Sequence, residues 1–370
     1  MLGAPSKLQR DAARNIVTKY LNVRAGENAI IESWDHTMPM ASAMVDEVRR
    51  VGGEVLFVYN DEDAWWRAID RGQTKLLGRS SAPEWAALKA TDVYVNFWGP
   101  GDAVRMEKDT EDKLNDAFAW NWPWYPVARK AGLRGVRMTT GFVTEGRAKE
   151  WGLDLAQWEE GLLRASLIDP EETARSAARL GKALSRGKKV RITHPNGTDV
   201  EVALAGAAPR LTDGRPHAWH KGDPASGMLQ QIPAGTLDVA LDSKTAEGSF
   251  HANRRTNIWW NWHAGGTLEF AGGKLTSYSF EYGGEDFAHR YKNGTAGKDR
   301  ASLLKFGLNP AVKDVPNLET VEGGSVSLQI GGNKFLPGGT NGSNFFNWFS
   351  LAGSEIAVDG TPLIRAGKVL

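Results

Sequence analysis

The hydrophobic positions in the first half of the chain follow two periods in alternation. Apolar residues recur every three to four positions, the spacing of an amphipathic helix, in the segments 8–20, 39–51 and 83–90. Short runs of mostly consecutive apolar residues, which suit buried strands, occur at 29–32, 54–59 and 92–97. Strands separated by helices in this way predict parallel βαβ units. Two further helices are expected at 154–165 and 170–184.

The second half of the chain changes to a period of two. Alternating apolar and polar residues flank two turns that favour hairpins, Asn196-Gly197 and Gly272-Gly273. We expect one helix in this otherwise strand-like region, near residues 299–305. The pattern predicts a β-rich α+β domain.

The two patterns meet at residues 185–189, which are polar, basic and poor in apolar side chains. A length of 370 residues also exceeds what one hydrophobic core usually organises. We therefore expect an α/β domain at 1–185, with a parallel sheet, and a β-rich domain that carries the functional site at 190–370.

Composition narrows the function classes. A net charge of +1 gives no electrostatic attraction for nucleic acid or an anionic membrane. The absence of cysteine excludes disulfides, zinc–thiolate sites and a thiol nucleophile. No segment resembles a signal peptide or a membrane span, so we expect a cytoplasmic protein. Fifteen tryptophans suit either a large core with a homodimer interface or a Trp-rich pocket for a planar ligand.

Short motifs in the second half resemble those of one enzyme family. They are Gly-Thr-Asp-Val at 197–200, Ile-Pro-Ala-Gly at 232–235, Gly-Leu-Asn-Pro at 307–310 and Gly-Gly-Thr-Asn-Gly-Ser at 338–343. Together they resemble the aminopeptidase T / aminopeptidase S family, whose members are two-domain, two-metal aminopeptidases. The resemblance implies an aminopeptidase T-like fold, with the catalytic-type domain in the second half of the chain.

The resemblance also identifies the positions that correspond to the family's metal ligands. The first ligand glutamate corresponds to Thr236, the bridging glutamate to about Leu303, and the first histidine to Ser327. The final His-x-Asp pair corresponds to Phe346 and Trp348. Divalent metal ions need several oxygen or imidazole ligands, which these side chains do not supply. We therefore expect no metal cofactor and a mechanism other than that of a metallo-aminopeptidase.

A lysine in the glycine-rich loop offers a substitute for the metal ions. An ammonium group can act as a fixed positive charge on a carbonyl, and Lys334 is the lysine of this loop. If it is desolvated beside Phe346 and Trp348, its neutral form is favoured and it can activate a hydroxyl nucleophile, for which Thr236 and Ser327 are the candidates. The alternative is that Lys334 extends to solvent as an ordinary loop lysine.

Other residues complete the expected site. The candidate acid/base groups are His217, His220 and His263. Either Arg254 or Arg255 is the candidate anchor for a substrate carboxylate. The residues expected to contact a planar substrate are Trp260, Trp262, Asn341, Phe346 and Trp348. A single relocated metal would draw on His217, His220, His251, His263 or His289, with Glu247, Glu285 or Asp286.

These observations favour a metal-independent, hydrolase-type enzyme that acts on a small planar or amide-containing molecule. Three alternatives stay open: an Fe(II)-dependent ring-cleaving enzyme similar to the dihydroxypyridine dioxygenases, a metallo-aminopeptidase with relocated ligands, and a non-catalytic homologue. The expected partners are a small-molecule substrate and a second copy of the chain, and neither nucleic acid nor a membrane.

Overall fold

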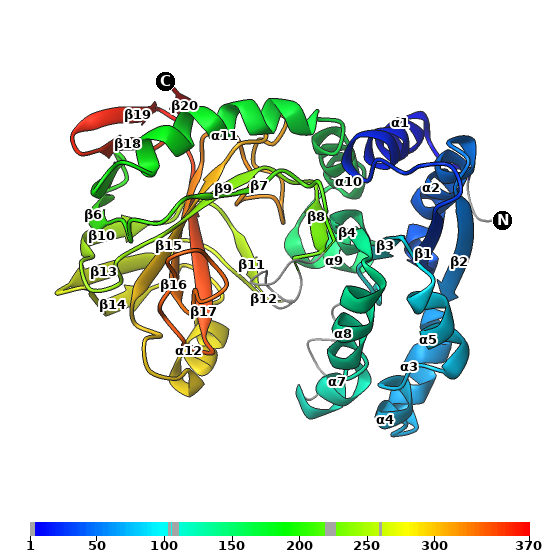
Figure 1. The fold of residues 1–370 in the computed structure, drawn as a ribbon. Coiled ribbons are helices and arrows are strands. Elements are labelled where there is room, and N and C mark those ends of the chain that lie inside the picture. The colour runs from blue at the N-terminus through cyan, green and yellow to red at the C-terminus, as the bar shows by residue number, and fades with distance from the viewer. Residues whose placement is uncertain (1–3, 103–104, 106–110, 219–226, 259–260) are drawn as a thin grey trace. The chain divides into compact units, whose positions relative to one another are not determined.

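The computed structural model describes residues 4–102, 105, 111–218, 227–258 and 261–370 (Figure 1). The chain divides into two compact units, Met1–Asp169 with Gly214–Pro233, and Pro170–Asp213 with Ala234–Leu370. This division differs from the expected boundary near residue 185. Helix α11 (Pro170–Leu184) packs against strand β9 (Thr236–Ala240) and so belongs to the second unit, whereas β8 (Leu229–Ile232) joins the sheet of the first.

The first unit contains the expected parallel sheet. Its strand order is β2-β1-β3-β4-β8, and each described pair runs parallel. The other strand bounds are β1 Asn28–Trp34, β2 Glu54–Asn60, β3 Val93–Phe97 and β4 Arg134–Met138. The strands at 29–32, 54–59 and 92–97 and the βαβ organisation are therefore confirmed.

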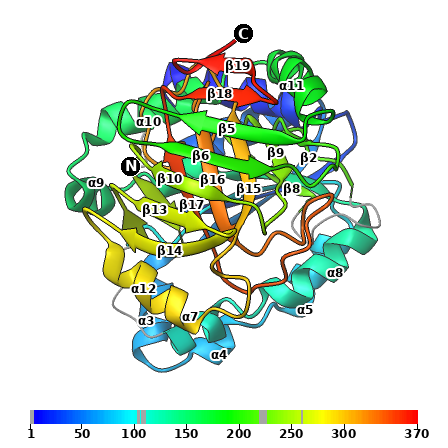
Figure 2. The ribbon, with the colours of Figure 1, turned by 90° about the vertical axis from the view of Figure 1, so that its left-hand side faces the viewer.

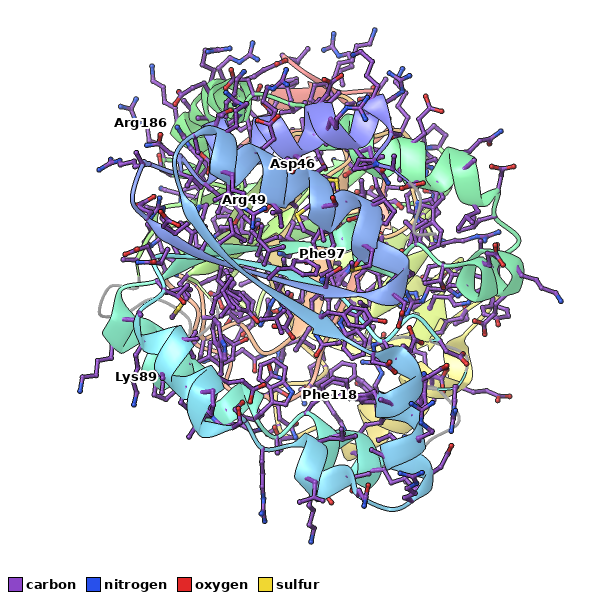
Figure 3. The ribbon with its side chains drawn as sticks, turned by 90° about the vertical axis from the view of Figure 1, so that its right-hand side faces the viewer. Asp46, Arg49, Lys89, Phe97, Phe118 and Arg186 are labelled. Atoms are coloured by element: carbon purple, nitrogen blue, oxygen red, sulfur yellow. The ribbon has the colours of Figure 1, made fainter. Side chains whose placement is uncertain are left out.

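Helices cover the parallel sheet. They are α1 Lys7–Asn15, α2 Met38–Arg50, α3 Glu62–Asp70, α4 Thr74–Leu77, α5 Ala82–Lys89, α7 Glu111–Ala117, α8 Asn121–Ala131, α9 Glu145–Trp151 and α10 Leu155–Ala165. Ile30 and Tyr94 of the sheet form one apolar cluster with residues of α5 and α8. Helix α2 packs on β1 and β2 and exposes Asp46 and Arg49, while Phe97 is buried (Figure 3). Among the described helices, none combines the length and apolar character that crossing a membrane requires.

The second unit is built from two antiparallel sheets (Figures 1 and 2). The long sheet has the order β14-β13-β10-β6-β5-β18-β19-β20, and the short sheet has the order β17-β16-β15-β9-β7. Strand bounds in the long sheet are β5 Lys189–Thr193, β6 Asp199–Ala203, β10 Glu247–His251, β13 Thr267–Ala271, β14 Lys274–Ser279, β18 Glu355–Val358, β19 Thr361–Arg365 and β20 Lys368–Val369. Those in the short sheet are β7 Arg210–Thr212, β15 Ala301–Gly307, β16 Val326–Gly331 and β17 Phe346–Leu351, besides β9. Both expected hairpins are confirmed as β5–β6 and β13–β14.

Two smaller elements accompany the sheets of the second unit. Strands β11 (Thr256–Ile258) and β12 (Asn261–His263) pair with each other, and helix α12 spans Gly284–Asn293. The core contains alternate residues of both sheets, such as Val190 and Phe250 of the long sheet and Leu304 and Phe349 of the short sheet. The α/β plus β-rich α+β fold class is therefore confirmed.

The expected helix near 299–305 is wrong. These residues lead into strand β15, which pairs with β9 on one side and with β16 on the other. Leu304 and Phe306 point into the core, so Leu303 and Lys305 point to the opposite face. A register shift between Ala301 and Leu303 interrupts the period of two, which is why the sequence pattern conceals this strand.

Candidate functional site on the short sheet

The side of the short sheet opposite the core carries a row of polar residues. Core residues occupy alternate positions in β9, β15, β16 and β17, so the residues between them lie on the other side. Four direct cross-strand neighbours form the row: Asp238, Lys305, Ser327 and Ser350. We call this side, with that row at its centre, the polar face.

The positions that the sequence resemblance matches to metal ligands all lie on this face. Thr236 and Leu303 are each two residues from the row, on β9 and β15, and Ser327 is in the row itself. Phe346 and Trp348 follow the same alternation on β17. Thr236 and Ser327 lie on the two strands that flank β15, with an offset of two residues, which separates their Cα atoms by about 12 Å.

Lys305 occupies the centre of the polar face. Its Nζ donates to Asp238 Oδ2 at 3.2 Å, and Arg210 Nη2 donates to the same oxygen at 3.4 Å. The Asp238 side chain is 1% exposed, whereas those of Lys305 and Arg210 are 20% and 31% exposed. Among the described residues, buried Asp238 Oδ1 has no hydrogen-bond partner. One carboxylate thus holds two cations, which leaves a net positive charge beside the positions that the resemblance matches to metal ligands.

The two serines of the row are not free hydroxyls. Ser327 Oγ and Ser350 Oγ lie 2.7 Å apart and share a hydrogen bond, and both residues are fully buried. The expected role of Ser327 as a nucleophile does not fit this arrangement, because its hydroxyl is engaged and shielded. Thr236 is 5% exposed and remains the candidate hydroxyl of the face.

A buried carboxyl group lies beside Trp348. Glu319 is 5% exposed, and its Oε1 accepts a hydrogen bond of 3.3 Å from Trp348 Nε1. Burial raises the pKa of Glu319 to about 7, and the negative charge of Glu322 acts in the same direction. Hydrogen bonds from the indole of Trp348 and from the Asn257 backbone oppose the shift without cancelling it. The polar face therefore has a carboxyl group that titrates near neutral pH.

Arg254 has an internal partner. Its Nε and Nη2 donate to the two carboxylate oxygens of Glu322 at 2.7 and 2.8 Å, and Asp314 lies 3.6 Å from Nε. The hydrogen bond with Glu322 raises the pKa of Arg254. Because its guanidinium is already held in bidentate fashion, Arg254 does not fit the expected role of an anchor for a substrate carboxylate.

Phe346 and Trp348 form a flat aromatic surface on β17. Their rings are stacked at a centroid distance of 5.9 Å and an interplanar angle of 15°, and both residues are half-buried. Trp262 stacks in a similar way on Tyr282 at 4.1 Å, and the guanidinium of Arg255 lies 5.0 Å from the Trp262 ring. Because Tyr282 and Arg255 already contact the Trp262 ring, the Phe346–Trp348 pair is the aromatic candidate for contact with a planar molecule.

Lys334 is exposed, which corrects the expectation of a desolvated lysine. It lies in the loop between β16 and β17, and its Nζ would be 2.8 Å from a Cβ placed on Gly342 of the same loop. Asn341 of this loop is 9% exposed and bonds to Ser343 N and Gly297 O. The glycine-rich loop thus holds Asn341 in its own hydrogen bonds.

His263 is structural and does not suit acid/base chemistry. It is 3% exposed, and Phe280 and Phe349 lie against its ring, each at a centroid distance of 5.1 Å. Its Nε2 lies 2.8 Å from Asn347 Nδ2, which makes that nitrogen an acceptor. Burial lowers the pKa of His263 to about 3, and the charge of Arg290 adds to this effect, so the imidazole is neutral at physiological pH.

Three of the expected site residues lie elsewhere or outside the described residues. His217 is exposed and belongs to the first unit. His220 and Trp260 lie outside the residues that the structure describes.

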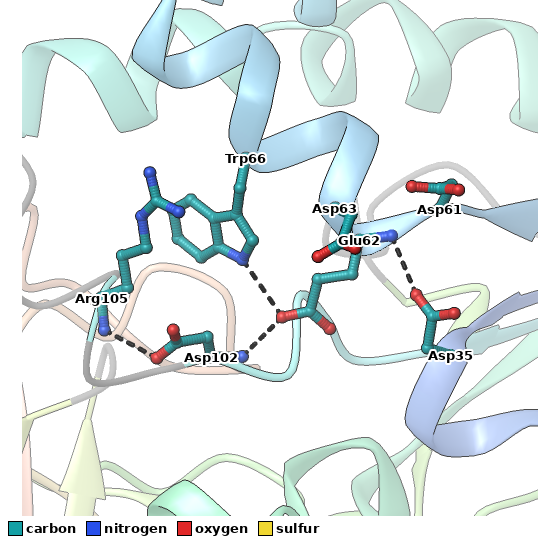
Figure 4. A pocket seen from close by; sticks show the side chains of 7 residues that line it. All are labelled: Asp35, Asp61, Glu62, Asp63, Trp66, Asp102 and Arg105. Atoms are coloured by element: carbon teal, nitrogen blue, oxygen red, sulfur yellow. Dashed lines mark hydrogen bonds between the residues drawn. The ribbon is translucent and has the colours of Figure 1, made fainter.

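The first unit has a pocket of its own, of about 410 Å³, at the carboxyl ends of its parallel strands (Figure 4). Asp35 follows β1, Asp61 and Glu62 follow β2, and Asp102 comes after β3. Burial opposes ionisation of Glu62, but hydrogen bonds from His36, the Asp102 and Gly101 backbone and Trp66 outweigh it and lower its pKa to about 2. The hydrogen bond that Tyr59 donates to Asp35 raises the pKa of Tyr59 to about 12.

No family model and no curated protein matches the sequence. Solved structures do match. Wild-type AmpT from Thermus thermophilus has a TM-score of 0.72 and 17% identity, over 98% of this chain and 99% of that chain. The 2,5-dihydroxypyridine dioxygenase of Pseudomonas putida KT2440 has a TM-score of 0.61 and 15% identity, over 99% of this chain and 98% of that chain. The fold is aminopeptidase T-like. At these identities the likeness establishes the fold alone.

The polar face does not fit the two metal ions that the sequence resemblance implies. The corresponding positions supply two hydroxyl groups and three apolar or aromatic side chains, and the Lys305 ammonium group lies between them. Among the described residues, no cluster of three or more His, Cys, Asp or Glu is placed to hold a metal ion. Hydroxyl, apolar and aromatic side chains do not supply the ligands that a divalent metal ion needs, and the Lys305 ammonium group provides the positive charge instead.

Sequence reasoning missed Asp238, Lys305 and Glu319. The first two are charged residues inside apolar runs, Thr-Leu-Asp-Val-Ala and Leu-Leu-Lys-Phe. Buried charges of opposite sign are usually paired, so reading 301–307 as a strand would have suggested their contact. Glu319 carries no comparable signal, because its burial depends on a loop that follows no period.

Proposed function

We propose that this protein is a metal-independent hydrolase that acts on a small planar or amide-containing molecule at the polar face. The observation that supports this proposal is the position of Lys305, in the middle of the positions that correspond to metal ligands. Its Nζ contacts Asp238 and is partly exposed. An ammonium group has three N–H donors, so two remain for a ligand besides the one that faces Asp238.

The chemistry follows from this charge. A lysine ammonium that donates to a carbonyl oxygen stabilises the negative charge that develops there when water attacks the carbonyl carbon. Asp238, with its hydrogen bonds from Lys305 and Arg210, holds the ammonium in position. The stacked rings of Phe346 and Trp348 provide a flat surface on which an aryl group can lie. The proposal keeps the function expected from the sequence and replaces Lys334 by Lys305.

The test compares two lysines in the same substitution. Purified protein is treated with a chelator, its metal content is measured, and it is incubated with a panel of aryl amides and aminoacyl anilides. We expect hydrolysis of at least one compound without metal, its loss in Lys305→Met and its retention in Lys334→Met. Hydrolysis that requires an added divalent metal, or that survives in Lys305→Met, contradicts the proposal.

A ring-cleaving dioxygenase is the second candidate, because one structure of similar fold is a 2,5-dihydroxypyridine dioxygenase. The flat aromatic surface suits a pyridine ring as well as an aryl amide. The donor set of the polar face argues against this candidate, since iron needs imidazole or carboxylate ligands. Oxygen uptake with a dihydroxypyridine in the presence of Fe(II) would favour it over the hydrolase.

A further inference from the structure

A second group on the polar face bears on proton transfer: the carboxyl of Glu319. It lies in the segment between β15 and β16, where Ser325 Oγ donates to its backbone carbonyl at 3.1 Å. Its Oε1 accepts from Trp348 Nε1, and the Asn257 backbone N–H also donates to this carboxyl. Its Oε2 is buried and has no hydrogen-bond partner among the described residues. One oxygen is therefore oriented by the protein, and the other is buried without a hydrogen-bond partner among the described residues.

Burial, and to a smaller extent the neighbouring charge, keeps a proton on this carboxyl group. The neighbouring carboxylate of Glu322 disfavours a second negative charge. The cation of this region, Arg254, is engaged by Glu322 and approached by Asp314. Glu319 thus has an indole and backbone amides as donors and no cationic partner among the described residues. In its neutral form, Oε2 becomes an O–H donor that still lacks an acceptor.

We propose that Glu319 is the acid–base residue of the polar face and exchanges a proton with the ligand through Oε2. This inference rests on the proposed hydrolase function. In the hydrolysis of an amide, the Glu319 carboxylate takes a proton from water as the water oxygen bonds to the carbonyl carbon. The C–N bond then breaks, and Glu319 returns that proton to the leaving nitrogen. Amide and water become a carboxylic acid and an amine, and Glu319 ends as it began.

The two charged groups then have separate roles. Lys305 interacts with the carbonyl oxygen, and Glu319 moves the proton. A carboxyl that titrates near neutral pH is present in both forms at that pH, as a group that acts first as a base and then as an acid requires. Trp348 links the two roles, because its indole orients Glu319 and its stacked ring borders the flat surface.

The first experiment does not depend on turnover. Infrared difference spectra record the protonated carboxyl band of the unmodified protein from pH 5 to 9, with and without benzamide, and Glu319→Gln identifies the band. We expect the band to titrate near pH 7 and its midpoint to shift when benzamide is added. A band that disappears with a midpoint near 4.5, or that benzamide leaves unchanged, overturns the inference.

A neighbouring substitution gives a matched control that keeps Glu319 in place. Glu322→Gln removes the like charge, so the Glu319 midpoint should fall. An unchanged midpoint would mean that the carboxyl is not in the environment described and would count against the inference. This measurement remains decisive if Glu319→Gln fails to fold.

Turnover separates this inference from the proposed function. If an aryl amide is hydrolysed, the rate of the unmodified protein should show an inflection near pH 7. Glu319→Gln should lose this inflection and about 10²- to 10⁴-fold in rate. Retention of the inflection in Glu319→Gln overturns the role of Glu319 while the hydrolase stands. If no amide is hydrolysed, the hydrolase fails, and the benzamide titration alone decides whether Glu319 exchanges a proton with a bound amide.

Discussion

Two glutamates of this protein, one in each unit, each accept a hydrogen bond from an indole N–H, and yet their pKa values are shifted in opposite directions. Glu62 bonds to Trp66 Nε1 at 3.1 Å in the first unit, and Glu319 bonds to Trp348 Nε1 at 3.3 Å in the second. The pKa of Glu62 is lowered to about 2, whereas that of Glu319 is raised to about 7. The shared hydrogen bond therefore does not decide the protonation state.

The difference lies in the remaining contacts. Glu62 Oε2 accepts from the Gly101 N–H at 2.8 Å, and its Oε1 accepts a second bond from the Asp102 N–H at 2.8 Å, with His36 also close. Both oxygens are satisfied, so the charged form is stable. Glu319 is more deeply buried, has a carboxylate neighbour in Glu322, and has one oxygen without a partner among the described residues. Burial raises the pKa of a carboxyl group when too few hydrogen-bond donors stabilise its charged form.

Asp238 differs from both glutamates because two cations contact its carboxylate. Substitution of Asp238 should have the largest effect on the free energy of unfolding. Asp238→Asn leaves Lys305 and Arg210 facing each other, and we expect the free energy of unfolding to fall by about 3–5 kcal/mol. Urea denaturation measures it. The matched control is Asp199→Asn, which breaks the exposed pair with Arg191 and should cost about 1 kcal/mol or less. Equal losses in both variants would show that the Asp238 cluster is no stronger than a surface pair.

The second-largest effect should be on the pH dependence of the unfolding free energy, which should differ in sign between Glu319 and Glu62. Glu319 has a raised pKa in the folded protein, so its contribution is fully present below its unfolded value of 4.5 and is lost as pH rises through about 7. Relative to Glu319→Gln, the unmodified protein should lose about 3 kcal/mol of unfolding free energy over this window. Urea denaturation at a series of pH values measures the difference. Parallel curves for the two proteins would disprove the raised pKa.

Glu62 should show the opposite slope and a smaller effect. Its lowered pKa stabilises the folded protein above pH 4.5, and this contribution is lost as pH falls through about 2. Glu62→Gln should reduce the unfolding free energy at pH 7 by about 1–3 kcal/mol, because it weakens hydrogen bonds to a charged acceptor. The same variant should be less sensitive to acid. A variant as stable as the parent at pH 7 would mean that these hydrogen bonds add little.

The smallest effect is expected at Lys334. Because this lysine is exposed, Lys334→Met should change the unfolding free energy by no more than about 0.5 kcal/mol. Thermal denaturation at neutral pH, in parallel with Lys305→Met, measures the change. A large loss of unfolding free energy in Lys334→Met would show that Lys334 makes contacts comparable to those of Lys305 and would contradict this prediction.

Much of the fold could be predicted from the sequence because its signals are local. The βαβ units of the first half and the hairpins around Asn196-Gly197 and Gly272-Gly273 follow from periodicity and turn chemistry. Strand β15 could not be predicted, because a register shift hides its alternation. The contact of Lys305 with Asp238 was therefore not expected, whereas Lys334 was considered because it lies in the glycine-rich loop.

The sequence by itself determined the fold class and the absence of thiol chemistry, and it shows that no carboxylate or imidazole stands at Thr236, Leu303, Ser327, Phe346 or Trp348. Each of these depends on residue identity or on neighbours along the chain. The tertiary structure decided that Lys305 contacts Asp238 and that the Glu319 carboxyl group is buried with one oxygen unpartnered among the described residues. Pairing and desolvation arise between residues distant in sequence, so no local pattern encodes them.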